Sequence, residues 1–294
     1  MSKKILITGA SGQLGNSVLN QLNGKYELLA TDISIDNINA LDIPFSVLDV
    51  TNFEQIKTTL SNFNPDVIIN LAAFTDVDGC ELNPEKAYLL NTKSVEMLSD
   101  KLNGHFIQIS TDYVFDGNNG PYSENDNTNP LSVYGKTKLK AEEMLQESAS
   151  NWCVLRTNVL FNYYHSTGAS FIKWVIDSLK LNKSINVVDD QWNNATWTQN
   201  FAEIIELVIN NNVKGIYNYG GADYLNRLEF AHIIADIFDL DKSLILPIST
   251  ASLNQAAPRP LKGGLKTEKI EKEFDIKCVD LKTSLNMIKS QIAI

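Results

Sequence analysis

The feature that most constrains the fold is an alternation of short apolar runs with amphipathic segments. Runs this short and continuous are typical of strands buried on both faces, whereas 53–63 and 84–102 carry apolar residues at helical spacing. Parallel strands need crossover connections, and helices supply them. The alternation therefore predicts an α/β fold with a doubly wound parallel sheet covered on both faces. The six expected strands are 3–8, 26–31, 45–50, 66–72, 105–110 and 152–157.

A glycine-containing loop follows the first expected strand, with the spacing GxxGxxG. Glycines there permit a tight turn and a close approach of the backbone to a pyrophosphate, which the amides of a helix N-terminus then bind. The motif alone is weak because glycines after a strand also mark ordinary turns. An amphipathic helix follows the loop, however, so the context favours a Rossmann dinucleotide site. Its expected contacts are Gly9, Ser11, Gly12, Gln13, Leu14 and Gly15.

Acidic residues close the next two strands. Asp32 ends the second strand, where a carboxylate can bind the adenosine ribose 2′-hydroxyl and repel a 2′-phosphate. The cofactor is therefore NAD(P)H, with NADH favoured, unless Asp32 is only a turn residue. Asp49 and Val50 close the third strand and are candidates for the adenine edge, although Asp at a strand end is also a common turn former.

The candidate catalytic groups follow the fifth strand. Tyr134 and Lys138 are four residues apart and share a helix face. A ketone that accepts hydride develops alkoxide character and needs a proton donor, and a cation beside a phenol lowers its pKa. Thr111, with Ser110 as the alternate, could hydrogen-bond the substrate oxygen. The pair alone is common by chance, but its combination with the glycine loop and Asp32 predicts carbonyl reduction.

The chain at this point resembles the extended short-chain dehydrogenases, and within them the dTDP-4-dehydrorhamnose reductase family. The resemblance is dense up to residue 161 and thinner afterwards. It rests on GASGQLG (9–15), PDVIINLAAFTDVDGCE (65–81), LLNTKSVE (89–96), STDYVFDG (110–117), PLSVYGKTKLKAE (130–142), RTNVLF (156–161), DDQWNNAT (189–196) and APRPLKGGL (257–265).

The resemblance implies hydride delivery to the C4 ketone of a nucleotide-linked 6-deoxy-4-keto sugar. Tyr134 would donate the proton, Lys138 would hold the nicotinamide ribose, and Thr111 would orient the substrate. Ala72, Ala73 and Asn91 would border the cofactor. The substrate would meet Asp76, Val77, Asp78, Asp112 and Tyr113. Separately, Arg259 could bind its diphosphate as a bidentate donor, or it could be a surface arginine fixed between two prolines.

The departures from the family pattern lie in the substrate half. Val159 stands where the family usually has Trp, and Phe161 where it has an aromatic hydroxyl. Asn193 and Ala195 replace an expected Gly and Pro. These changes would reshape the sugar or base pocket without touching Tyr134 and Lys138. Stacking against base or sugar is an option for Trp192 and Trp197, which flank the altered stretch.

Two alternatives remain open. A sugar-nucleotide epimerase or dehydratase shares the same motifs, but dehydratases typically carry Glu where this chain has Tyr113. A non-catalytic NAD(P)-binding regulatory subunit is the other, because the same fold serves as a partner of a methionine adenosyltransferase.

We expect a dinucleotide-binding domain at 1–157 and an interleaved substrate-binding region at 158–294, with strands at 184–188 and 215–220 and helices at 168–181, 198–212 and 226–239.

Composition excludes several partner classes. A net charge of −10 disfavours nucleic acids and anionic membrane surfaces, so the cations that bind an anionic substrate must be concentrated in its pocket. The three cysteines show no metal or disulfide spacing, and no acidic cluster requires a metal. The absence of an apolar span leads us to expect a cytoplasmic location. The oligomeric state stays open, with a homodimer as one option.

Overall fold

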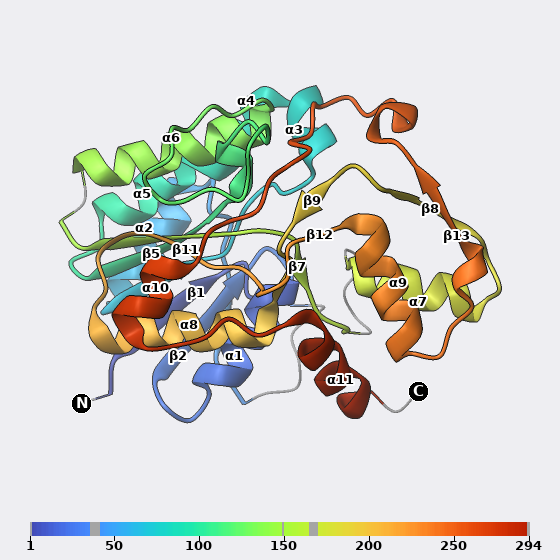
Figure 1. The fold of residues 1–294 in the computed structure, drawn as a ribbon. Coiled ribbons are helices and arrows are strands. Elements are labelled where there is room, and N and C mark those ends of the chain that lie inside the picture. The colour runs from blue at the N-terminus through green and yellow to red at the C-terminus, as the bar shows by residue number, and fades with distance from the viewer. Residues whose placement is uncertain (1, 36–41, 149, 165–169, 293–294) are drawn as a thin grey trace.

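A parallel sheet of seven strands forms the centre of the computed structural model, which describes residues 2–35, 42–148, 150–164 and 170–292 (Figure 1). The strand order is β11-β6-β5-β4-β1-β2-β3. The predicted doubly wound α/β fold is therefore confirmed. The strands are β1 (Lys4–Thr8), β2 (Glu27–Asp32), β3 (Phe45–Val47), β4 (Val67–Asn70), β5 (His105–Thr111), β6 (Trp152–Thr157) and β11 (Gly215–Asn218).

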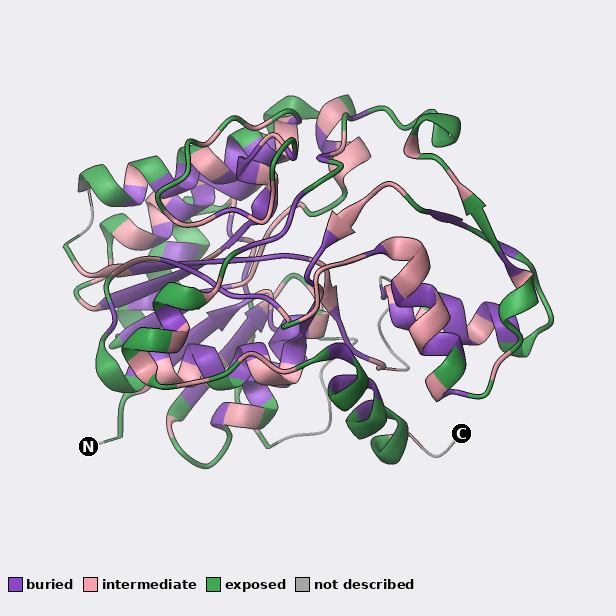
Figure 2. Cartoon of the chain, in the orientation of Figure 1, coloured by how far each residue is buried: buried purple, intermediate pink, exposed green. Residues whose placement is uncertain are grey.

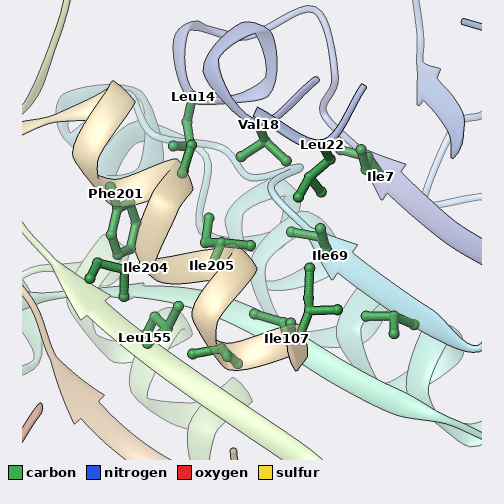
Figure 3. Close-up of a cluster of buried hydrophobic side chains, with 14 of the residues drawn as sticks. Ile7, Leu14, Val18, Leu22, Ile69, Ile107, Leu155, Phe201, Ile204 and Ile205 are labelled. Carbon is green, nitrogen blue, oxygen red and sulfur yellow. The ribbon is translucent and has the colours of Figure 1, made fainter. Parts of the chain in front are cut away.

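Helices cover both faces of this sheet because successive strand side chains point to opposite sides. Ile7 packs against α1 (Gln13–Leu22) and α8 (Thr198–Asn211), as Figure 3 shows, and Ile5 belongs to the same core. Leu6 belongs to the opposite core, which the remaining sheet helices close. The inner strands β1, β4, β5 and β6 are consequently buried almost throughout, whereas the edge strand β3 is not (Figure 2). The helices of the opposite core are α2 (Phe53–Phe63), α5 (Ser94–Asp100) and α6 (Val133–Ser148).

The seventh strand comes from the second half of the sequence. The sequence places the strand expected at 215–220 in the substrate-binding region, but β11 pairs in parallel with β6 at the edge of the main sheet. The preceding helix, α8, packs beside α1 from the first half. The chain therefore returns to the sheet after residue 157. The helix α10 (Glu268–Phe274) covers the same face of the sheet as α1 and α8, because its Ile270 belongs to their core.

A smaller second core lies beside the sheet. Buried residues such as Phe161 and Phe230 join three helices and a two-stranded parallel pair. The helix expected at 168–181 spans 171–180, and residues 168 and 169 lie outside the described ranges. The elements are α7 (Phe171–Lys180), β8 (Ile185–Val188), α9 (Arg227–Ile237), β13 (Ile245–Ile248) and α11 (Leu281–Gln291).

Short elements connect the two parts. The helix expected at 84–102 is divided into α4 and α5 by a π-helical turn. Two-residue strands occupy the junction, with β7 parallel to β10 and β9 antiparallel to β12. These elements are α3 (Val77–Leu82), α4 (Pro84–Tyr88), η1 (Leu89–Lys93), η2 (Asp112–Val114), β7 (Leu160–Phe161), β9 (Trp192–Asn193), β10 (Thr196–Trp197), β12 (Leu225–Asn226), η3 (Lys242–Leu244) and η4 (Thr250–Leu253).

A late segment of the chain is bound to the glycine- and asparagine-rich loop after β5. The amide of Gly120 donates to the carbonyl of Lys262 at 3.0 Å, and the amide of Tyr122 donates to the carbonyl of Gly264 at 3.0 Å. These bonds hold residues 260–266 beside the carboxyl end of β5. Throughout the described ranges, each helix is too short or too polar to cross a membrane.

Candidate active site

The glycine loop packs tightly against the end of β4. Gly9 has φ +66°, and a Cβ at that position would lie 2.7 Å from the amide nitrogen of Ala72. A Cβ on Gly15 would lie 2.4 Å from the carbonyl oxygen of Ala10. The helix α1 begins after Gly12, which provides no side-chain cap for the first-turn amides. These amides can therefore bind an anion, which fits the pyrophosphate of a dinucleotide.

Asp32 lies beside this loop. Its carboxylate accepts hydrogen bonds from the amides of Ser11 at 2.9 Å and Ile33 at 2.7 Å, which fixes it at the carboxyl end of β2. The two candidates for the adenine edge, Asp49 and Val50, lie after β3. Asp49 accepts from the amide and hydroxyl of Thr51, as a turn former does, and Val50 is 5% exposed in the core. The adenine contact expected of Asp49 and Val50 stays a prediction.

Tyr134, Lys138 and Thr111 meet at the carboxyl end of β5. Thr111 is the last residue of that strand, and its hydroxyl hydrogen-bonds the phenol of Tyr134. The ammonium of Lys138 donates to the carbonyl of Ile109 at 2.6 Å. The ring of Tyr113 meets the ring of Tyr134 edge-on, with 5.6 Å between centroids. The three candidate catalytic residues thus lie around one strand end.

Burial controls the titration of this group. Desolvation raises the pKa of Tyr134 and outweighs the hydrogen bond from Thr111, which lowers it. Desolvation also lowers the pKa of Lys138 to about 8, against the opposing effect of Glu142. We expected the pKa of Tyr134 to be lowered by Lys138, but the pKa is raised, so this expectation is wrong. The phenol is protonated at neutral pH, as a proton donor must be.

A buried ion pair that sequence reasoning missed supports the same helix face. Glu142 is 0% exposed and Arg156 is 3% exposed. The Nη2 of Arg156 lies 2.6 Å from Oε2 of Glu142, and its Nε lies 3.0 Å from Oε1. Ser110 also donates to this carboxylate. The hydroxyl of Ser110 is therefore engaged, which favours Thr111 as the substrate-orienting group.

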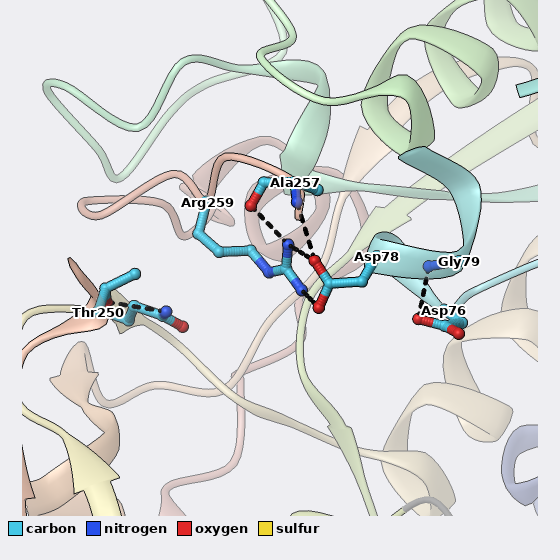
Figure 4. Close-up of polar contacts among 7 residues, drawn as sticks. Asp76, Asp78, Gly79, Thr250, Ala257 and Arg259 are labelled. Carbon is cyan, nitrogen blue, oxygen red and sulfur yellow. Dashed lines mark hydrogen bonds and ion pairs between the residues drawn. The ribbon is translucent and has the colours of Figure 1, made fainter. Parts of the chain in front are cut away.

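Two of the expected substrate residues form an ion pair with each other. The carboxylate of Asp78 contacts the guanidinium of Arg259 through two hydrogen bonds, of 2.8 and 3.0 Å (Figure 4). Arg259 lowers the pKa of Asp78. Asp76 caps the start of α3 by accepting from the amide of Gly79 at 3.0 Å, and Val77 is the first residue of that helix. The pair joins α3 to the C-terminal stretch.

Asp112 and Asn91 are buried and already have partners. The carboxylate of Asp112 accepts from the amide of Gly264 at 3.0 Å, and burial raises its pKa. The side chain of Asn91 accepts from the amide of Phe74 at 2.7 Å and donates to its carbonyl at 3.1 Å. Both therefore position loops at the sheet edge. The half-buried Ala72 and Ala73 follow β4 beside the glycine loop.

The altered family positions reshape the second core and its border. Val159 has φ +40°, a left-handed conformation that is strained for a β-branched residue. Phe161 is 1% exposed and packs against Phe230. Trp197 is 3% exposed in the same core, so the stacking role suggested for it is wrong. The remaining positions lie at the border: Trp192 stacks on Tyr224, and Asn193 and Ala195 line a small cavity.

Comparisons with known proteins agree with this arrangement. The model of the RmlD substrate binding domain family matches residues 3–293. This chain belongs to that family. A dTDP-4-dehydrorhamnose reductase of Aggregatibacter actinomycetemcomitans is 34% identical over 98% of each chain. Methionine adenosyltransferase 2 subunit beta of Xenopus tropicalis is 32% identical, over 92% of this chain and 82% of its own length.

A solved structure extends the similarity to three dimensions. The dTDP-4-dehydrorhamnose reductase of Bacillus anthracis, in complex with NADP, superposes with a TM-score of 0.90 at 26% identity. The match covers 99% of this chain and 100% of that one. The family resemblance inferred from the sequence motifs is therefore confirmed over the whole length, the altered substrate half included.

Proposed function

We propose that this protein reduces the C4 ketone of a nucleotide-linked 6-deoxy-4-keto sugar with NAD(P)H, the dTDP-4-dehydrorhamnose reductase reaction. The observation that carries the proposal is the meeting of Tyr134, Thr111 and Lys138 at one strand end. The glycine loop with open helix amides lies at the same edge of the sheet, where doubly wound folds bind dinucleotides. The named reductases among the relatives support the same activity.

The side chains divide the chemistry between them. The nicotinamide, when bound, supplies the hydride. Tyr134 keeps its proton at neutral pH and donates it to the developing alkoxide. Thr111 hydrogen-bonds the substrate oxygen beside that phenol. Lys138 places a positive charge near the phenolate that remains, which lowers the energy of the charge-separated state.

The expected cofactor preference is a separate proposal. The carboxylate of Asp32 lies beside the glycine loop and would repel a 2′-phosphate, so NADH is preferred over NADPH. The ratio of kcat/KM for the two cofactors measures this preference. Asp32→Ser should lower the ratio of kcat/KM for NADH to kcat/KM for NADPH by on the order of tenfold, which corresponds to about 1.4 kcal/mol. An unchanged ratio would reject the role of Asp32.

A non-catalytic subunit is the second candidate function, and the similarity to methionine adenosyltransferase 2 subunit beta is the observation that favours it. An epimerase or dehydratase has less support, because a phenol rather than a carboxylic acid stands at Tyr113. Tightly bound NAD with turnover in the absence of added NADH would favour that third activity. A homodimer stays a prediction, and light scattering tests it by measuring the molecular mass in solution.

The test is the oxidation of NADH by a dTDP-linked 4-keto-6-deoxy sugar. Wild type should turn over, and Tyr134→Phe should lose on the order of 10²- to 10⁴-fold in kcat, the usual contribution of a positioned proton donor. Tyr26→Phe is a matched control, since its hydroxyl contacts Asn210 on the far side of the molecule from β5's carboxyl end. Equal rates for wild type and Tyr134→Phe would overturn the proposal.

A further inference from the structure

The substrate of the proposed reaction carries a diphosphate, which an acidic chain can bind only with a local cation. Sequence reasoning assigned that part to Arg259. The guanidinium of Arg259, however, makes two hydrogen bonds to Asp78 and a third to the carbonyl of Ala257 at 2.8 Å. Its side chain is 9% exposed. Arg259 therefore holds the C-terminal stretch against α3, and its charge is largely neutralised.

Arg227 carries a second guanidinium, and its charge and that of Arg259 both act on the phenol of Tyr113. It is the first residue of α9, it is half-buried, and its Cζ lies 5.3 Å from the ring centroid of Phe171. Burial lowers the pKa of Arg227, while the nearby Tyr113 and Asp112 partly offset this effect. Among the residues that the structure describes, none forms an ion pair or hydrogen bond with this guanidinium.

An arginine in this state favours an anionic ligand. Five N–H donors are held at a site where burial has removed part of their water. Asp112, a neighbouring carboxylate that acts on Arg227, accepts a hydrogen bond from the amide of Gly264 and has a raised pKa. The charge of Arg227 is thus poorly compensated by the protein itself, and a ligand phosphate could supply the compensation.

The position fits a ligand that spans the two parts of the molecule. Arg227 begins α9 directly after β12, which pairs with β9, and Trp192 of β9 bridges to Lys262. A Cβ on the next residue, Gly263, would lie 2.7 Å from the carboxylate of Asp112, the residue before Tyr113. Arg227 therefore stands on the smaller part near this strand end, and Tyr113 and Tyr134 belong to the part built on the sheet. The charge of Arg227 acts on the phenol of Tyr113, whose ring contacts Tyr134. A sugar at Tyr134 would therefore have its phosphates within reach of the smaller part.

We propose that Arg227 binds the diphosphate of the nucleotide-linked substrate, and that Arg259 is a structural clasp. The inference rests on the proposed function, because it takes the substrate to be a nucleoside diphosphate sugar. Arg227 then contributes to substrate affinity, and the tyrosine, lysine and threonine contribute to the chemical step.

The test compares the binding of dTDP and thymidine by calorimetry. Wild type should bind dTDP more tightly than thymidine because of the diphosphate. Arg227→Met should weaken the affinity for dTDP on the order of tenfold to a hundredfold, because it removes a charge-assisted bidentate contact. Its affinity for thymidine should be unchanged. Arg227→Lys should lose less, because it keeps the charge but not the planar fork. Lys183→Met, which removes an exposed charge between α7 and β8, should bind dTDP as wild type does.

The outcomes separate the two proposals. Normal dTDP affinity in Arg227→Met, with wild type active on the keto sugar, would overturn the role of Arg227 and leave the function standing. Absence of both dTDP binding and turnover in wild type would overturn the function and this inference together. Unchanged NADH affinity in Arg227→Met shows that the variant is folded, so a loss confined to dTDP supports the proposal.

Discussion

Glu142→Gln tests the buried ion pair that anchors the catalytic helix. The substitution keeps the size of the side chain but removes the charge that faces Arg156. Both residues are almost fully buried, and Ser110 donates to the same carboxylate. The variant therefore leaves a guanidinium desolvated without its counter-charge, while the Nη1 of Arg156 already lacks a partner.

Removal of one member of a buried pair costs about 3 to 5 kcal/mol. Unfolding entropy near 2.1 cal/mol/K per residue, taken over 294 residues, converts this loss into a fall in Tm of about 5 to 8 °C. Replacing both members by apolar residues, Glu142→Leu with Arg156→Met, should recover most of the loss because no charge remains buried.

Thermal unfolding followed by circular dichroism measures the effect. Glu143→Gln is the matched control, because it makes the same substitution on the next residue of α6, whose ion pair with Lys140 is solvent-exposed. The control should melt within about 1 °C of wild type. A Glu142→Gln protein that melts as close to wild type as the control does would refute the assigned cost of the buried charge.

Two further predictions concern pH. Lys138 is protonated below its pKa of about 8, so kcat/KM for reduction should fall as pH rises through about 8. Glu142→Gln removes a charge that raises this pKa and should therefore move the fall in kcat/KM to lower pH. A flat profile from pH 7 to 9 argues against a role for the charge of Lys138. His105 donates to the carbonyl of Val213 at 2.9 Å, and burial lowers its pKa to about 4, so native His105 is neutral. The neutral form of His105 therefore stabilises the fold above pH 6.5, and this stabilisation should be lost as pH falls toward 4. Urea titrations should show that the free energy of unfolding of wild type falls by about 2 to 3 kcal/mol more over this range than that of His105→Gln. The same pH dependence of the unfolding free energy in both proteins would count against this prediction.

Local patterns predicted the elements well. Continuous apolar runs marked the strands because both faces of a parallel sheet are buried, and 53–63 is a helix with the bounds that its apolar spacing indicates. The pairing of β11 with β6 was missed, because the partner of a strand depends on contacts between distant parts of the chain. The strand itself, at 215–220, was expected.

The candidate site was predicted in part. The grouping followed from the helix spacing of Tyr134 and Lys138 and from the place of Thr111 at the end of a strand. The ion pair of Asp78 with Arg259 joins residues far apart in sequence, which no local pattern indicates. Glu142 was within reach of sequence reasoning, because it lies one further helical turn beyond Lys138 on the same face. The direction of the pKa of Tyr134 depends on burial, which spacing does not determine.

Isotope transfer tests the central claim most directly. NADH deuterated at C4 of the nicotinamide, on the transferred face, is incubated with the dTDP-linked 4-keto sugar, and the product is examined by NMR and mass spectrometry. The account predicts one deuterium at C4 of the sugar for each NADH oxidised, and a rate that collapses in Tyr134→Phe. Deuterium that stays on the cofactor, or appears at C4 equally fast without the phenol of Tyr134, would contradict it.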